Sequence, residues 1–118
     1  MKSRQELHDE LRKKILALPQ VREQQDAGIH EDAFFIQRTM FMHIHGHGYC
    51  DIRLPKEAQQ QILAQGKAQP HRWASEAGYV TFILKHEEDL KIAMELVQIS
   101  YNHFVDHKNF FNINRSTI

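Results

Sequence analysis

Apolar residues recur at helical spacing in two stretches of the chain. Near the start, four of them fall at i, i+4, i+8 and i+11, and these are Leu7, Leu11, Ile15 and Leu18. This stripe predicts a helix with one apolar face, capped by Ser3 and stopped by Pro19. A second stripe covers residues 87–106, with three acidic residues in its first turn, where they favour the helix dipole. A shorter helix is expected over residues 55–65, which begin with a proline and are followed by a glycine.

Other parts of the chain carry short runs in which apolar and polar residues alternate or β-branched residues are frequent. The runs that predict strands are residues 33–37, 39–45, 49–54 and 79–85, and Val21 marks a candidate short edge strand. The order α-β-β-β-β-α-β-α predicts an α+β fold, an antiparallel sheet of four to five strands with helices packed on one face. At 118 residues the chain is expected to form one domain over residues 1–106, followed by a C-terminal tail at 107–118.

Two of these strands, residues 39–45 and 49–54, each have an apolar side and a mixed side when successive residues alternate. The apolar sides are expected to be Met40, Met42 and Ile44 on the first strand and Cys50, Ile52 and Leu54 on the second. Both must face the core, because a slip of one residue would expose all of them. A three-residue loop over residues 46–48 satisfies this condition, with Gly48 in the left-handed position. This loop pairs Ile44 with Cys50 and Met42 with Ile52. On the mixed side it pairs His43 with Asp51, His45 with Tyr49 and Phe41 with Arg53.

The mixed side of this hairpin is the strongest candidate for a functional site. Its expected members are His43, His45, Asp51 and Arg53 from the hairpin, with His71 and Trp73 from the connector at residues 67–78. An imidazole beside a carboxylate can act as an oriented general base, which makes His43 and Asp51 the catalytic candidates. Imidazoles on one face could also hold a metal ion, and the candidates are His43, His45 and His71. Trp73 would either cover the site or anchor the core. For the patch as a whole, the simpler alternative to a functional site is an uncovered sheet face whose polar side chains are only solvated.

Composition indicates the class of protein and its location, but it does not indicate which reaction or ligand the site would serve. Fifteen basic and fifteen acidic residues leave no net charge, so nucleic acid is not an expected partner. Nine histidines are the unusual feature, and those outside the hairpin and the connector, such as His8, are expected at the surface. The N-terminal residues are not typical of a signal peptide, and no apolar run is long enough to span a membrane. With Cys50 as its one cysteine, buried and unreactive, the chain is expected to be a soluble cytoplasmic protein.

Three segments together resemble a known family. They are MHIHGHGYCDIRLP at residues 42–55, AQPHRWASEAGYVTF at 68–82 and EEDLKIAMELVQISY at 87–101. They are similar to the small luciferase-domain family, whose members show patterns close to AHxHGDGxxDxRLP, EPHPWxPxSGWVTF and EEDxxxAxxLxxxAY. The resemblance covers about residues 10–105. The family's recurring positions here are His43, His45, Asp51, Arg53, Leu54, Pro55, His71, Trp73, Gly78 and Thr81.

This sequence departs from the family pattern at three positions. His47 stands where an aspartate is usual, Arg72 where a proline is usual, and Tyr79 where a tryptophan is usual. The resemblance implies an α+β outline similar to small frataxin-like folds and places the site at the hairpin. It names no activity, substrate or cofactor.

Three classes of function are therefore open. The leading hypothesis is a binding module for a small anionic molecule, with Arg53 as the charge partner and the imidazoles as hydrogen-bond donors. A second is a hydrolase or lyase that uses the His43–Asp51 pair, with or without a metal ion. A third is a protein-interaction module or homodimer that uses the sheet face and Phe110–Phe111 of the tail.

Overall fold

The computed structural model describes the backbone of residues 2–26, 31–46 and 48–116. Its elements along the chain are α1 (Arg4–Leu16), β1 (Val21–Asp26), β2 (Glu31–Ile36), β3 (Thr39–His45), β4 (Tyr49–Arg53), α2 (Lys56–Ala64), β5 (Gln69–Pro70), the 3₁₀ turn η1 (Ser75–Ala77), β6 (Tyr79–Ile83) and α3 (Asp89–Ser116). The strands form one antiparallel sheet in the order β1-β2-β3-β4-β6-β5. The α+β fold is therefore confirmed. The candidate edge strand at Val21 is present as β1, and the one strand beyond those expected is the two-residue β5, which pairs with β6.

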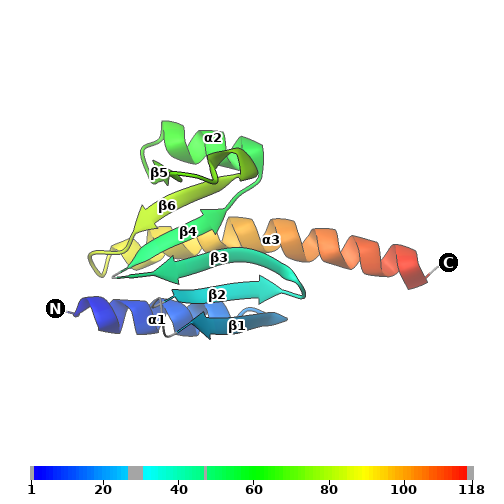
Figure 1. The fold of residues 1–118 in the computed structure, drawn as a ribbon, viewed down its shortest axis with the longest axis horizontal. Helices are drawn as coiled ribbons and strands as arrows, with labels where there is room; N and C mark the ends of the chain where they lie inside the picture. The colour runs from blue at the N-terminus through cyan, green and yellow to red at the C-terminus, as the bar shows by residue number, and fades with distance from the viewer. Residues whose placement is uncertain (1, 27–30, 47, 117–118) are drawn as a thin grey trace.

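One face of the sheet is covered by α1 and α3, which lie on the same side in Figure 1. The core lies between these helices and the strands, and its fully buried side chains include Leu11, Ile15, Phe34, Ile44, Ile52, Val80, Leu96 and Val97. The short helix α2 lies at the β5–β6 end of the sheet and contributes Ile62 to the same core. The opposite face of β3, β4 and β6 has no helix over it in Figure 1, and the hairpin's polar side chains lie there.

Helix α1 forms for the reasons that its sequence indicates. Ser3 accepts a hydrogen bond from the Glu6 backbone N–H through its hydroxyl, and the Glu6 side chain accepts one from the Ser3 backbone N–H. Leu7, Leu11 and Ile15 are all buried, as their spacing predicts. The predicted cap and the first three members of the core face are confirmed, but the helix ends at Leu16, so Leu18 lies beyond it and Pro19 is not its direct stop.

The expected alternation along β3 is wrong at its first residues. Phe34 pairs with Met42 and Phe35 pairs with Met40, so the register shifts and Phe41 has no partner of its own. This β-bulge turns Phe41 into the core, where it is fully buried, and leaves Met40 half-exposed on the other face. The expected Phe41–Arg53 pair does not form for the same reason, and the β3–β4 ladder ends at Met42.

Helix α3 starts two residues later than its apolar stripe predicts and is longer. The Asp89 carboxylate accepts hydrogen bonds from the backbone N–H groups of Lys85 and His86, which orders the chain just before the helix. The helical backbone continues to Ser116, through much of the predicted tail at 107–118. The side chains of Phe110 and Phe111 lie outside the described residues. None of the helices in the described part of the chain has the length and apolar character that a membrane span requires.

Candidate functional site

The β3–β4 hairpin has the register that burial parity predicts. Ile44 pairs with Cys50, and His43 pairs with Asp51, so the two polar side chains are direct cross-strand neighbours. Gly48 has a positive φ of 92°, and a Cβ there would lie 2.6 Å from the Leu84 carbonyl oxygen. Only glycine fits this approach of β4 to the residue after β6. The loop residue His47 lies outside the described residues.

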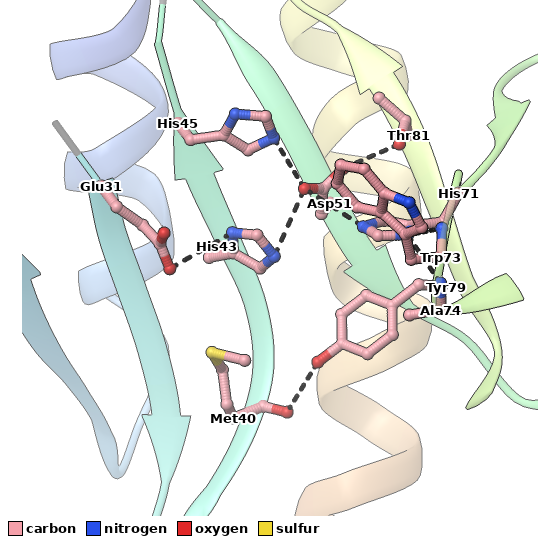
Figure 2. A network of polar contacts seen from close by, with 10 residues as sticks. All are labelled: Glu31, Met40, His43, His45, Asp51, His71, Trp73, Ala74, Tyr79 and Thr81. Atoms are coloured by element: carbon pink, nitrogen blue, oxygen red, sulfur yellow. Dashed lines mark hydrogen bonds and ion pairs between the residues drawn. The ribbon is translucent and has the colours of Figure 1, made fainter. Parts of the chain in front are cut away.

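The carboxylate of Asp51 is the centre of the candidate site, and only 2% of this residue is exposed. Its Oδ1 accepts a hydrogen bond of 2.7 Å from the Thr81 hydroxyl on β6. Its Oδ2 lies 2.7 Å from Nε2 of His45, 3.3 Å from Nε2 of His43 and 3.5 Å from Nε2 of His71 (Figure 2). We call Asp51 and these imidazoles the His–Asp cluster. Tertiary structure therefore brings His71 to the hairpin, although it follows Asp51 by 20 residues.

The position of the proton on His71 follows from its backbone contacts. Its Nδ1 accepts hydrogen bonds from the backbone N–H groups of Trp73 at 3.1 Å and Ala74 at 2.9 Å. A nitrogen that accepts two N–H groups carries no hydrogen, so the neutral ring holds its proton on Nε2. His71 therefore presents an N–H to Asp51 and at the same time fixes the loop at residues 71–74.

His43 is largely enclosed, with 17% of its side chain exposed. Burial lowers the pKa of His43 below its ordinary value, and the nearby charges of Asp51 and Glu31 oppose this effect only in part. Its Nδ1 is buried and has no hydrogen-bond partner among the described residues, although it lies 3.4 Å from a Glu31 carboxylate oxygen. His45 differs, because 42% of its side chain is exposed.

A hollow of about 680 Å³ adjoins the His–Asp cluster on this face of the sheet. Its lining residues come from β2, β3, β4, β6 and the connector, and they are Glu31, Met40, His43, His45, Tyr49, Asp51, His71, Arg72, Trp73, Ala74, Tyr79 and Thr81. The bulge explains why Met40 lines the hollow instead of joining the core. Trp73 is 83% exposed, so the alternative in which it anchors the core is wrong. Its position at the hollow fits the alternative in which it covers the site.

The structure does not place Arg53 where the sequence-based hypothesis expects it, and a different arginine, Arg72, lies at the hollow instead. Arg53 does not line the hollow: its Nε donates to the Ala77 carbonyl at 3.0 Å, and its guanidinium lies 5.2 Å from the Phe104 ring centroid. Arg72 does line it, with its guanidinium 5.2 Å from the Trp73 ring centroid. Among the described residues that line the hollow, Arg72 is the one with a permanent positive charge. The sequence signal for Arg72 was its place between His71 and Trp73.

A metal ion is the less favourable interpretation of this cluster. The candidate ligand atoms of His43, Asp51 and His71 all lie within 4.8 Å of one another, which could accommodate an ion. Nε2 of neutral His71, however, carries the proton, because Nδ1 accepts two backbone N–H groups. Ligation through Nε2 would place a hydrogen on Nδ1 against both of them. The arrangement fits a hydrogen-bonded proton network better than a metal centre.

A second His–Asp contact lies away from the hollow. Nε2 of His8 on α1 lies 2.6 Å from Oδ2 of Asp32 on β2, and only 15% of the His8 side chain is exposed. The expectation of a surface position for His8 is therefore wrong, because α1 packs beside the sheet there. Neither residue lines the hollow, so this pair serves as a matched control for the His–Asp cluster.

Cys50 faces the opposite side of β4 from Asp51 and is fully buried. Burial is the main cause that raises the pKa of Cys50 to about 12, and the charge of Asp51 adds to it. The side chain therefore remains a thiol near neutral pH, as expected for an unreactive core cysteine.

Comparison with known families supplies the remaining observation. Residues 38–100, more than half of the chain, match the family model of the Luciferase domain. The chain belongs to the luciferase domain family. The matched segment of this luciferase domain contains the whole His–Asp cluster, the loop at residues 71–74 and the first part of α3. No curated protein and no solved structure matches the chain.

Proposed function

We propose that this luciferase domain binds a small anionic molecule in the hollow beside the His–Asp cluster. The observation that carries the proposal is the hollow itself, whose volume of about 680 Å³ is in the range of small-molecule sites. It joins a permanent cation, Arg72, to several imidazoles and aromatic rings. Such a lining can enclose the apolar part of a ligand and fix its polar group.

The charges of the lining indicate where an anionic group would lie. Asp51 and Glu31 are carboxylates, so an anion is disfavoured beside them unless the neighbouring imidazoles are protonated. Arg72 offers a charged, planar donor group in the connector, and arginine binds carboxylate and phosphate through paired N–H groups. The anionic group is therefore expected beside Arg72, with the rest of the ligand extending toward His45.

Isothermal titration calorimetry with benzoate and phenyl phosphate tests the proposal. Wild-type protein should bind at least one of these probes, and R72Q should weaken that binding at least about tenfold because the charged contact is lost. R53Q is the matched control, since Arg53 lies outside the hollow, and it should bind as wild type does. Absence of binding at millimolar concentration, or equal binding by R72Q, would overturn the proposal.

A second candidate function, acid–base catalysis, is favoured by one contact. Nε2 of His45 lies 2.7 Å from Asp51, which can hold that nitrogen protonated and leave Nδ1 free as a base. His45 is more exposed than His43, so the structure favours His45 over His43 as the group that would exchange a proton with a substrate. A water molecule activated in this way could attack an ester or a related acyl group.

Hydrolysis of 4-nitrophenyl acetate tests this candidate. In the step, Nδ1 of His45 takes a proton from water, the water oxygen bonds to the acyl carbon, and 4-nitrophenolate leaves. H45Q should reduce the rate at least about tenfold if His45 is the base. H8Q removes the His8–Asp32 contact, which lies away from the hollow, and should leave the rate unchanged. If the wild type hydrolyses 4-nitrophenyl acetate no faster than H45Q does, catalysis of this reaction is rejected.

A further inference from the structure

We infer that the anionic ligand of this luciferase domain carries a planar ring, and that this ring stacks on Trp73. The inference rests on the proposed function and names the class of ligand that the same hollow would take. It starts from an unusual feature, a tryptophan that is 83% exposed on a loop that several contacts hold in place.

The loop that carries Trp73 is fixed at both ends. The backbone N–H of Trp73 donates to Nδ1 of His71, whose ring also contacts Asp51. After the loop, Gly78 has a φ of 99°, and a Cβ there would lie 2.3 Å from the Leu54 carbonyl oxygen. The Leu54 N–H in turn donates to the Gly78 carbonyl at 3.0 Å. The exposure of the indole therefore results from an ordered loop that keeps a large apolar surface in contact with solvent.

Rings also form the opposite side of the hollow. Figure 2 shows His43 and His45 on one side of the Asp51 carboxylate and His71 with Trp73 on the other, in agreement with the strand order. The rings of His43 and His45 are nearly parallel, with centroids 5.5 Å apart and an interplanar angle of 25°. Tyr49 continues this stack beyond His45 at 5.6 Å and 18°. Flat side chains on both sides favour a flat ligand over a branched one.

Arg72 places a positive charge beside the Trp73 ring, where the anionic group of the ligand is expected. Its guanidinium lies 5.2 Å from the centroid of the Trp73 ring, so a positive charge and an apolar aromatic surface are adjacent. A molecule whose carboxylate or phosphate is attached directly or through one atom to an aromatic ring can contact both at once. Benzoate and phenyl phosphate are the simplest members of this class.

Trp73 is the one tryptophan of the chain, so the intrinsic tryptophan fluorescence of the full protein reports on this position alone. Benzoate and phenyl phosphate should change its intensity or emission maximum on titration. Their saturated counterparts, cyclohexanecarboxylate and cyclohexyl phosphate, have the same charged groups without a flat ring. We expect the aromatic member of the tighter-binding pair to bind at least about tenfold more tightly than its counterpart, as aromatic stacking commonly provides.

The variant W73L keeps an apolar side chain and removes the ring, and calorimetry measures its binding because it has no tryptophan. Its preference for aromatic over saturated probes should disappear, while circular dichroism remains that of the wild type. W73F should retain part of the preference. Equal affinity of the aromatic and saturated probes for the wild type, with R72Q still weakening both, would overturn the stacking inference and leave the proposed function standing. Absence of binding by all four probes would overturn both.

Discussion

The two faces of the β3–β4 hairpin have opposite chemistry although they alternate along the same residues. On the helix-covered face, Ile44, Cys50 and Ile52 are fully buried. On the other face, His43 and Asp51 lie beside a hollow. The comparison shows that burial of the first face sets the register, and the register then determines which polar side chains meet on the second. The geometry of the site therefore depends on the core.

The faces also differ in how their polar groups are satisfied. On the covered side, the Ser100 hydroxyl donates to the Phe41 carbonyl, and the Tyr101 hydroxyl donates to the Pro19 carbonyl at 2.8 Å. On the open side, Nδ1 of His43 is buried without a hydrogen-bond partner among the described residues, and one Asp51 oxygen faces several imidazoles. Local departures from complete satisfaction are typical of functional sites.

The largest effect is expected at the bulge in β3, which directs Phe41 to the covered face and Met40 to the open face. Phe41→Ala should lower the free energy of unfolding by about 3–5 kcal/mol, because it removes a fully buried ring from the core. Met40→Ala is the matched control and should cost about 1 kcal/mol or less, since Met40 lies on the open side. Urea denaturation followed by circular dichroism measures both. A larger loss for Met40→Ala than for Phe41→Ala would show that the bulge is misplaced.

An intermediate effect is expected at the centre of the open face. Asp51→Asn should lower the free energy of unfolding by about 1–3 kcal/mol, because it replaces by an amide a buried carboxylate that contacts Nε2 of His45 and the Thr81 hydroxyl. Thr81→Val removes only the hydroxyl contact to Oδ1 and should cost about 0.5–1.5 kcal/mol. Denaturation of both variants at pH 7 provides the comparison. Unchanged stability of Asp51→Asn would mean that the cluster does not hold this face together.

A smaller effect concerns pH. Because burial lowers the pKa of His43 in the folded protein, the unfolded chain binds this proton more readily. The contribution of His43 to stability is therefore present above about pH 6.5 and is lost as the pH falls toward the lowered value, by about 1.4 kcal/mol for each pKa unit of depression. His43→Gln should flatten this part of the stability profile, whereas His86→Gln, at an exposed position, should not. The same slope in wild type and His43→Gln would contradict the assignment.

The smallest effect is expected for the largest side chain of the hollow. Trp73→Ala should change the free energy of unfolding by no more than about 0.5 kcal/mol, because the indole is 83% exposed in the folded state. Its effect should appear in ligand binding and not in denaturation. A loss above about 2 kcal/mol would instead indicate that Trp73 packs as a core residue. The contrast between the two faces would then disappear.

Local periodicity was sufficient for much of the fold. The spacing of Leu7, Leu11 and Ile15 predicted the buried face of α1, and the capping residue Ser3 is where the sequence placed it. Parity along the hairpin predicted the His43–Asp51 pair, because a one-residue slip would have exposed several apolar side chains together. These predictions succeeded because they depend on neighbours a few residues apart or on one short loop.

Predictions that depended on long-range packing were less successful. The bulge at Phe41 results from pairing between β2 and β3, which strict alternation within one strand does not anticipate. The two-residue β5 forms only because the connector pairs with β6. Arg53 turns toward Ala77 and Phe104, and Arg72 lines the hollow in its place.

The sequence by itself determined the types of the longer elements, the hairpin register and the presence of His43, His45 and Asp51 on one face, because alternation and burial act locally. The sequence named His71 as a candidate, but only the tertiary structure showed that it reaches Asp51 and that its Nδ1 binds the backbone of the Trp73 loop. It also decided that Arg72 rather than Arg53 lines the hollow. Those outcomes depend on how the connector packs over β6. Contacts between residues 20 or more positions apart are selected by the packing of the whole domain, which no short stretch of sequence specifies.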